Sequence, residues 1–331
     1  MEKFLQRVVS KEDLPVLYQE LKKFEHELDQ YLRCDCDALY ASARHLLRSG
    51  GKRMRPAIFL LGSRFGPDYD LARLRPMAMS LEVIHIASLV HDDVVDASQV
   101  RHGRPTVKAK WGNEVSVYTG DYLIGKAMEL VTSYHDPFLN DRLITVAAEM
   151  CRGELAQMEN LYKLDGRVAS YIGRIKRKTA MLLSASCELG AYLAHADAPI
   201  VAALGRYGSA IGTAFQIIDD ILDYSPDEGG FGKLVGGDVR QGLSTLPLIY
   251  ALESAGPGAD EIRRLFPKRE KTDAEVARIV DIVHGSGAMK RSRLLAQSYI
   301  HKAKQYMAFV PECQTKQYFI AMADFVIERD F

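Results

Sequence analysis

Two runs of aspartate residues interrupt apolar helical patterns in this chain, and they restrict its possible folds more than any other feature. The first run lies in Leu89–Asp96 and the second in Phe215–Asp223. Their acids occupy positions i, i+1 and i+4 and are Asp92, Asp93, Asp96, Asp219, Asp220 and Asp223. A helix has about 3.6 residues per turn, so positions i and i+4 share one face. Two such faces turned toward each other would gather all of these carboxylates in one place.

Such a concentration of negative charge inside a protein is too costly unless cations neutralise it. The ligands would be hard carboxylate oxygens, with neither cysteine nor a histidine pair at ligand spacing, and this donor set favours Mg²⁺. Because Mg²⁺ commonly shares phosphate oxygens with a substrate, the pattern predicts a metal-bridged diphosphate. One run alone could be a solvated helix face. Its repetition within two apolar segments favours the functional interpretation.

The overall composition narrows the class of protein. The chain has 331 residues, 47% of them hydrophobic, and its 43 basic and 43 acidic side chains cancel. A neutral chain has no general attraction for nucleic acid, and its weak self-repulsion is compatible with oligomerisation. The five cysteines lack zinc-site spacing and are typical of a reducing cytosol. Without an apolar signal region or a long uncharged apolar stretch, we expect a soluble, cytoplasmic protein with no transmembrane segment.

Apolar residues recur at helical spacing through most of the chain, whereas no strand alternation, internal repeat or linker is evident. The expected helices cover 12–33, 37–49, 56 onward, 71–96, 114–134, 138–163, 168–195, 198–225, 245 onward, 259–266, 272–286, 287–309 and 311–329. Gly205, Gly208 and Gly212 are spaced so that another helix could approach closely. We therefore expect an all-α fold in which residues 1–331 form a single-domain helical bundle.

Four further segments could bind phosphate groups. Gly50–Pro56 combines two glycines and several cations with the start of a helix, where backbone amides and the helix dipole favour an anion. Arg101–Thr106 is a cationic turn beside the first acid run, and Arg174–Lys178 contains four cations. Gly229–Asp238 is a glycine-rich loop of the kind that forms a lid or wraps a phosphate. Each segment alone could equally be an ordinary solvated surface.

Together these motifs resemble those of the trans-isoprenyl diphosphate synthases, also called polyprenyl synthetases. The resemblance covers about residues 40–255 and keeps the order of the family's motifs, which are Gly50–Pro56, Asp92–Asp96, Lys178–Thr179, Phe215–Gln216, Asp219–Asp223 and Gly232–Pro247. Within the family, Val107–Trp111, Tyr118–Tyr122 and Ile175–Ala180 are most similar to the catalytic subunit, component II, of two-component heptaprenyl diphosphate synthases. The resemblance implies an isoprenoid synthase domain with a central cavity.

The resemblance also implies a role for each motif. Mg²⁺, with about three ions when a diphosphate is bound, would be held by Asp92, Asp96, Asp219 and Asp223, with Asp93 and Asp220 as supporting acids. The leaving diphosphate of an allylic substrate such as farnesyl diphosphate would contact Arg101, Lys178 and Lys233. Oxygen dipoles beside the allylic cation would come from Thr179 and Gln216. Isopentenyl diphosphate would bind in a cationic pocket that is formed by Lys52, Arg55, His85 and His102.

Two positions depart from the family pattern. Many members have arginine where this chain has His102, and that arginine contacts isopentenyl diphosphate. Because histidine is only partly charged near neutral pH, we expect weaker and more pH-dependent binding of this substrate. The second departure is Leu243, where many members place a lysine before the Thr-Leu-Pro turn, so one phosphate contact is expected to be missing.

The residues that precede the first acid run predict a medium or long product. The growing product would extend along the helix that precedes Asp92. Its path would pass the residues four, five, eight and eleven positions before Asp92, which are Ser88, Ala87, Ile84 and Leu81. In short-chain relatives an aromatic side chain at one of the first two positions blocks further extension of the product. In this chain both of these positions have small side chains. Ile84 and Leu81, with a bulky residue such as Tyr118, Tyr122 or Met128, would then stop the chain at about six to eight isoprene units, heptaprenyl favoured. Alternatively, Ala87 and Ser88 simply allow tight helix packing.

Three other functions were weighed. His91-Asp92 could belong to an HD-type metal phosphohydrolase, but the second acid run offers no histidine ligand. A class I terpene cyclase shares the first acid motif but usually has a mixed second motif and lacks the cations at 52–55. A non-catalytic subunit of the same fold would not need intact metal motifs.

We expect the protein to be a homodimer, or a heterodimer with a small non-catalytic subunit. We also expect that the product can be delivered at a membrane surface, for example for use as a menaquinone side chain.

Overall fold

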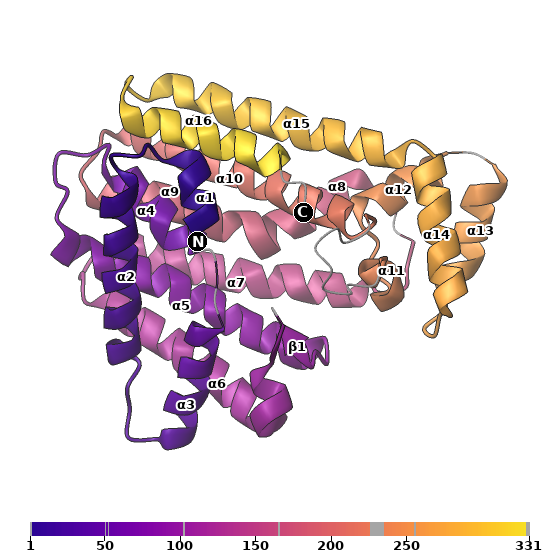
Figure 1. Ribbon diagram of the computed structural model, residues 1–331, viewed down its shortest axis with the longest axis horizontal. Helices are drawn as coiled ribbons and strands as arrows, with labels where there is room; N and C mark the ends of the chain where they lie inside the picture. Colours follow the sequence, from indigo (N-terminus) through magenta and orange to yellow (C-terminus); the bar gives the residue numbers. More distant parts are fainter. Residues whose placement is uncertain are drawn as a thin grey trace. The chain divides into compact units, whose positions relative to one another are not determined.

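The computed structural model describes residues 2–49, 51, 53–101, 103–164, 166–225, 235–254 and 256–328. The described residues are almost entirely helical (Figure 1). The helices are α1 (Glu2–Val8), α2 (Leu14–Tyr31), α3 (Asp37–Arg48), α4 (Met54–Ser63), α5 (Leu71–Val95), α6 (Val107–Thr132), α7 (Pro137–Glu159), α8 (Val168–Ile175), a π-helical turn (Lys176–Ala180), α9 (Met181–Leu193), α10 (Ala198–Leu222), α11 (Gly237–Gln241), α12 (Leu246–Glu253), α13 (Pro257–Leu265), α14 (Asp273–Gly285), α15 (Ala288–Tyr306), a 3-10 turn (Met307–Phe309) and α16 (Gln314–Ile327). Two short strands, β1 (Val100–Arg101) and β2 (Arg104–Pro105), pair antiparallel.

The all-α fold expected from the sequence is confirmed, and most predicted helices begin and end within a few residues of the observed ones. Four features were not predicted: α1, the β1–β2 hairpin, the short α11 and the π-helical turn. The helix expected from 114 instead begins at Val107 and is kinked at Gly112, whose φ is 87°. Only a residue without a Cβ atom adopts such a φ readily, so the kink is a property of that glycine.

The described chain forms two compact units. The first comprises residues 1–145, 185–205 and 312–318, and the second comprises 146–184, 206–311 and 319–331. In the first unit α5 and α6 lie side by side and antiparallel (Figure 1). Ser80 on α5 donates a hydrogen bond to the carbonyl of Ala127, while His91 lies 3.3 Å from the carbonyl of Val117. A Cβ atom at Gly120 would lie 2.2 Å from the ring of His91, so this glycine is required for the close approach.

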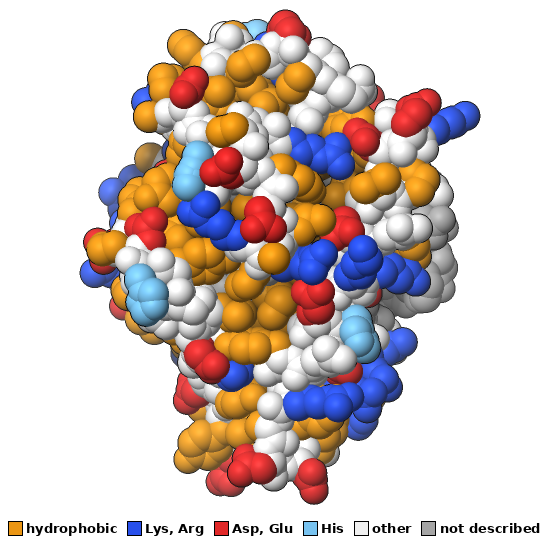
Figure 2. Space-filling model, turned by 90° about the vertical axis from the view of Figure 1, so that its left-hand side faces the viewer, with side chains coloured by type: hydrophobic (Ala, Val, Ile, Leu, Met, Phe, Trp, Pro, Cys, Tyr) orange, Lys and Arg blue, Asp and Glu red, His pale blue; other side chains and the backbone are white. Residues whose placement is uncertain are grey.

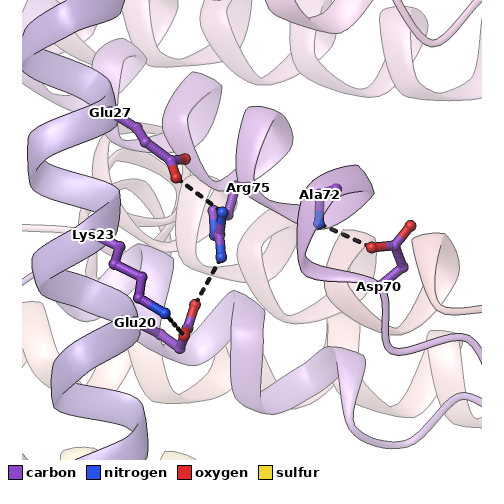
Figure 3. A network of polar contacts seen from close by, with 6 residues as sticks. All are labelled: Glu20, Lys23, Glu27, Asp70, Ala72 and Arg75. Atoms are coloured by element: carbon purple, nitrogen blue, oxygen red, sulfur yellow. Dashed lines mark hydrogen bonds and ion pairs between the residues drawn. The ribbon is translucent and has the colours of Figure 1, made fainter.

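The start of α5 is fixed to α2 by a network of ion pairs (Figure 3). Arg75 pairs with Glu20 at 3.1 Å and with Glu27 at 2.8 Å, and Lys23 also pairs with Glu20. Asp70 caps α5 by accepting a hydrogen bond from the amide of Ala72. This network holds the end of α5 that lies opposite to its aspartates.

Arg53 immediately precedes α4 and is buried, with only 4% of its surface exposed. Its guanidinium pairs with Glu82 and Glu25, each at 2.9 Å, and donates to the carbonyl of Leu47. Burial alone would lower the pKa of Arg53, but the two carboxylates raise it. Arg53 therefore stabilises the structure and does not contribute to the diphosphate cradle that the sequence suggested around 50–56.

The backbone around Arg53 also differs from expectation. The left-handed conformation was expected at Gly50-Gly51, but Arg53 has it, with a φ of 46°, and Gly51 has a φ of 152°. Gly50 lies outside the described residues. Pro56 was expected to begin the next helix and is instead the third residue of α4.

The second unit has its own hydrophobic core, which is built around α12, α13 and α14. Its largest fully buried side chains include Tyr224 and Phe266. The close helix approach predicted at Gly212 is confirmed, since a Cβ atom there would lie 2.7 Å from the Cα atom of Ala180. At Gly205 the nearest contact of such an atom would be an ordinary 3.4 Å.

The surface in Figure 2 mixes positive and negative side chains with hydrophobic ones. This distribution accords with the zero net charge of the chain. In the part of the chain that the structure describes, no helix has the length and apolar character needed to cross a membrane.

We predict that Arg53→Met lowers the free energy of unfolding by about 3–5 kcal/mol, because Glu82 would be left buried without a partner. Arg152→Met is the matched control, since Arg152 is 71% exposed on its side chain and pairs with Glu149 at the surface. The control should cost less than about 1 kcal/mol. Denaturant unfolding of both variants measures the difference, and equal losses would contradict the structural role of Arg53.

Candidate active site

The first acid run lies at the C-terminal end of α5, in the first unit. Asp93 is 2% exposed, Asp92 is half-buried and Asp96 is exposed. Arg101 donates from Nε to the carboxylate of Asp93 at 2.8 Å. The inner acid of this run therefore has its own protein cation.

The β1–β2 hairpin brings Arg101 back over this helix end. Thr106 donates from its hydroxyl to the carbonyl of Ser98 and from its amide to that of Gln99, which closes the loop. Gly103 lies in the turn with a φ of 73°. The sequence assigned Arg101 to the leaving diphosphate, whereas in the structure it also holds Asp93 in place.

Two residues of the predicted isopentenyl diphosphate pocket lie on the neighbouring helices α4 and α5 of the first unit. Arg55 is half-buried, and among the described residues its Nε has no hydrogen-bond partner although it is buried. Burial lowers the pKa of Arg55, and the nearby Glu82 opposes this effect. His85 is half-buried one turn after Glu82 on α5. An anion bound beside Arg55 would satisfy its buried Nε.

The predicted chain-length residues line one side of α5. Leu81 and Ala87 are completely buried, Ile84 is 4% exposed, and Ser88 is half-buried with its hydroxyl donating to the carbonyl of His85. Burial is required for a role in product length, but it is equally compatible with tight helix packing.

Of the bulky residues proposed to end the product chain, Tyr118 is in the wrong place. It is 67% exposed on α6, because Gly120 and not Tyr118 faces α5. Tyr122 is half-buried and donates from its hydroxyl to the carbonyl of Leu32, and Met128 is half-buried.

The second acid run lies at the C-terminal end of α10, in the second unit, and is part of a chain of hydrogen bonds. Thr179 donates to the amide oxygen of Gln216 at 2.9 Å, and Gln216 donates to Asp220 at 2.9 Å. Tyr171 donates to the other oxygen of Asp220 at 2.7 Å. The predicted residues Thr179, Gln216 and Asp220 are thus brought together.

Burial raises the pKa of Asp220 to about 6, and the hydrogen bonds from Gln216 and Tyr171 oppose the increase. Burial also raises the pKa of Tyr171 well above its usual value, so this tyrosine remains a proton donor. Asp220, which the sequence predicted to be a supporting acid, is held by neutral donors, whereas Asp93 in the first unit is held by Arg101.

Asp223 connects the end of α10 to the segment that follows the glycine-rich loop. Its carboxylate accepts a hydrogen bond from the amide of Asp238 at 2.8 Å, at the start of α11. Its carbonyl accepts another from the amide of Gly236. One carboxylate oxygen of Asp223, a predicted metal ligand, therefore already accepts a backbone hydrogen bond. Asp219, the other predicted ligand of this run, is half-buried at the end of α10.

Lys178 and Thr179 lie in the π-helical turn between α8 and α9. Lys178 pairs with Glu154 of α7 at 2.5 Å. A Cβ atom at Gly153 would lie 2.9 Å from the amide nitrogen of Lys178, so α7 passes directly against this turn. Isolated π-turns of this kind are frequent at functional sites because they change the direction of side chains.

Both acid runs occupy helix C-termini, where the helix dipole is negative and disfavours carboxylates. Neither α5 nor α10 has a basic residue in its last turn. A bound cation would offset both the helix dipole and the lack of a basic residue in the last turn. Carboxylate oxygens are the donors that Mg²⁺ prefers. Among the described residues, no group of three or more His, Cys, Asp or Glu side chains that could hold a metal ion was found.

Three predicted site residues, Lys52, His102 and Lys233, lie outside the described residues. Sequence reasoning missed Tyr171 and Glu154, whereas Arg174 belongs to the cation cluster that the sequence indicated. Tyr171 precedes Lys178 by seven residues, two helical turns, and this spacing could have placed it on the face of the site. Nothing local in the sequence identifies Glu154, because its contact with Lys178 is tertiary.

Comparison with known proteins decides the family. Residues 36–283 match the model of the polyprenyl synthetase family, which is three-quarters of the chain. The chain belongs to the polyprenyl synthetase family. This polyprenyl synthetase is therefore an enzyme of the prenyltransferase class, as the motifs predicted.

Relatives of this polyprenyl synthetase match along nearly the whole chain. It is 39% identical to heptaprenyl diphosphate synthase component 2 of Bacillus subtilis, over 95% of this chain and 89% of that protein. The crystal structure of heptaprenyl diphosphate synthase from Staphylococcus aureus matches with a TM-score of 0.90 at 32% identity, covering 95% of this chain and 99% of the other. Polyprenyl synthase from Caulobacter crescentus, complexed with calcium and isoprenyl diphosphate, has a TM-score of 0.90 at 33% identity and 98% coverage of both chains.

We predict that Tyr171→Phe lowers the free energy of unfolding by about 1–3 kcal/mol, because Asp220 would lose a donor in a buried site. Tyr118→Phe is the matched control, since Tyr118 is 67% exposed. It should change stability by less than about 0.5 kcal/mol. Thermal or denaturant unfolding measures both, and a silent Tyr171→Phe would show that the hydrogen bond to Asp220 contributes nothing.

Proposed function

We propose that this enzyme condenses an allylic diphosphate, farnesyl diphosphate in the first instance, with successive molecules of isopentenyl diphosphate. The product is an all-trans polyprenyl diphosphate. One observation carries the proposal: each acid run lies at a helix C-terminus and has its inner carboxylate already held by protein donors. In our proposal the outer carboxylates of each run bind cations, and membership of the polyprenyl synthetase family supports it.

The proposal assigns metal binding to the acids of both clusters. Mg²⁺ would be held by Asp92, Asp96, Asp219 and Asp223, and when bound it would neutralise the charge that develops on the leaving diphosphate. A relative from Caulobacter crescentus that is complexed with calcium and isoprenyl diphosphate supports a divalent metal. The donor set, which consists of carboxylates, fits a hard cation of this kind.

The other residues have separate tasks in this mechanism. Lys178, Arg101 and Lys233 would contribute positive charge to the leaving diphosphate. The oxygen of Thr179, fixed by its hydrogen bond to Gln216, would lie beside the allylic cation. The double bond of isopentenyl diphosphate would attack that cation, and the departed diphosphate would then take the proton. No nucleophilic serine or cysteine is needed.

Isopentenyl diphosphate would bind to Arg55, His85 and Lys52, with His102 in the place of a family arginine. The buried Nε of Arg55 supports this assignment. Leu243 offers no charge where many relatives have lysine, so the remaining cations would bind the allylic diphosphate alone. We propose the cytoplasm as the location of the reaction.

We favour a heptaprenyl product, in a range of about six to eight units. The support is the small side chains of Ala87 and Ser88 on α5, together with the relative from Bacillus subtilis named component 2 of heptaprenyl diphosphate synthase. That name also supports a second, smaller subunit as a partner for this chain. The partner could complete or shield the space that a long apolar product occupies.

Prenyl transfer is tested with the purified chain, farnesyl diphosphate, isopentenyl diphosphate and Mg²⁺, with and without a small non-catalytic subunit from a two-component relative. We expect a polyprenyl diphosphate, and we expect chelation to abolish its formation. Asp92→Asn and Asp219→Asn should each reduce the rate about 10²–10³-fold. Asp141→Asn removes an exposed acid of α7 and should have no effect. Full activity in the first two variants would contradict the proposed metal ligands.

We predict that Ala87→Phe shortens the product by about two isoprene units, because Ala87 lies about 9 Å along α5 from Leu81. Chromatographic sizing of the products measures the change. Ala274→Phe adds the same aromatic ring at an exposed position of α14 and should leave the product unchanged. An unaltered distribution in Ala87→Phe would favour the simple packing role of this residue.

A further inference from the structure

The second unit contains a cavity of about 390 Å³ that neither acid run lines. It is bounded by the end of α7, the segment before α8, one face of α8 and the start of α12. Its volume lies within the range of ligand pockets, about 300–1,000 Å³. In the proposed reaction none of its lining residues contacts a substrate.

The charged side chains that line the cavity are all positive. They are Lys163, Arg167, Arg174 and Arg177, and no aspartate or glutamate is among the lining residues. Arg177 is partly neutralised by Glu149 at 3.0 Å. Polar groups that line it besides these cations include Asn160 and Ser170. The electrostatic potential inside such a cavity favours an anion.

Ser244 gives an independent indication of a ligand. It is 5% exposed and lines the cavity, yet among the described residues its hydroxyl has no hydrogen-bond partner. Arg174 donates to the carbonyl of Ser244 at 2.8 Å, and its own buried Nε is also without a partner in the described part of the chain. Buried polar groups are normally satisfied, so two unsatisfied donors at one wall indicate an acceptor that binds there.

Tyr171 connects this cavity to the second acid cluster. It is one of the lining residues of the cavity, and its hydroxyl donates to Asp220. The guanidinium of Arg174 lies over the same ring, 5.7 Å from its centre. An anion in the cavity would therefore lie one side chain away from the proposed catalytic carboxylates.

We propose that this cavity binds a small phosphate-bearing anion at Arg174, Ser244 and the flanking Lys163 and Arg167. Phosphate oxygens accept several hydrogen bonds and carry the charge that guanidinium and hydroxyl donors satisfy. Inorganic diphosphate is the probe of choice, and this choice rests on the proposed function, because prenyl transfer releases it. The same chemistry is offered by the headgroup of an anionic lipid.

The test is calorimetric titration of the full chain with inorganic diphosphate in the presence of a chelator, which removes any metal-bridged binding at the carboxylates. We expect saturable binding. The double variant Lys163→Gln/Arg167→Gln should bind about three- to tenfold more weakly. Arg269→Gln/Lys290→Gln removes the same charge from exposed positions outside the cavity and should bind like the unmodified chain.

A second arm uses vesicles of phosphatidylglycerol and of phosphatidylcholine in a sedimentation assay. Binding to the anionic vesicles that the cavity variant loses would support the site with a lipid headgroup as its occupant. Unchanged affinity in the cavity variant for both probes, or no binding of either, would overturn the proposal. If the double variant does not fold, Ser244→Ala answers the same question, since unchanged diphosphate affinity would again overturn it. These measurements need no catalysis, so their failure leaves prenyl transfer untouched.

Discussion

The structure depends on carboxylates placed where a helix tolerates them least. The last turns of α5 and α10 already carry the negative end of the helix dipole, and each also contains two aspartates. Protein donors hold the inner acid of each run. Asp93 has Arg101, while Asp220 has Gln216 and Tyr171. In the first unit the β1–β2 hairpin positions Arg101 beside Asp93, and in the second unit the π-helical turn positions Thr179 beside Gln216.

Much of this arrangement could be read from the sequence because it is local. The apolar periodicity gave the all-α fold, and the i, i+4 spacing placed Asp92 with Asp96 and Asp219 with Asp223 on common helix faces. The family resemblance assigned both Thr179 and Gln216 to the site, and the structure adds a hydrogen bond between them that was not predicted. Membership of the polyprenyl synthetase family confirms the general activity.

Features that depend on tertiary contacts could not be predicted. The cation run at 50–56 did not reveal that Arg53 is buried against Glu82, because its partner lies 29 residues away. The outward direction of Tyr118 follows from the contact of Gly120 with α5. The ion pair between Lys178 and Glu154 of α7 depends on how two helices cross, so no local pattern predicts it. In each case a residue distant in the sequence determines the direction or the partner of the side chain.

The π-helical turn at Lys176–Ala180 has a consequence for how this enzyme tolerates change. A π-turn holds one more residue than the corresponding α-turn, so it acts as an insertion that offsets α8 from α9 by about 100° of rotation. Deleting one residue there would restore a continuous α-helix. The side chains of either α8 or α9 would then rotate away from the residues that they contact. A change of length in this turn is therefore expected to be more damaging than a substitution at the exposed Lys176, which keeps the orientation of both helices.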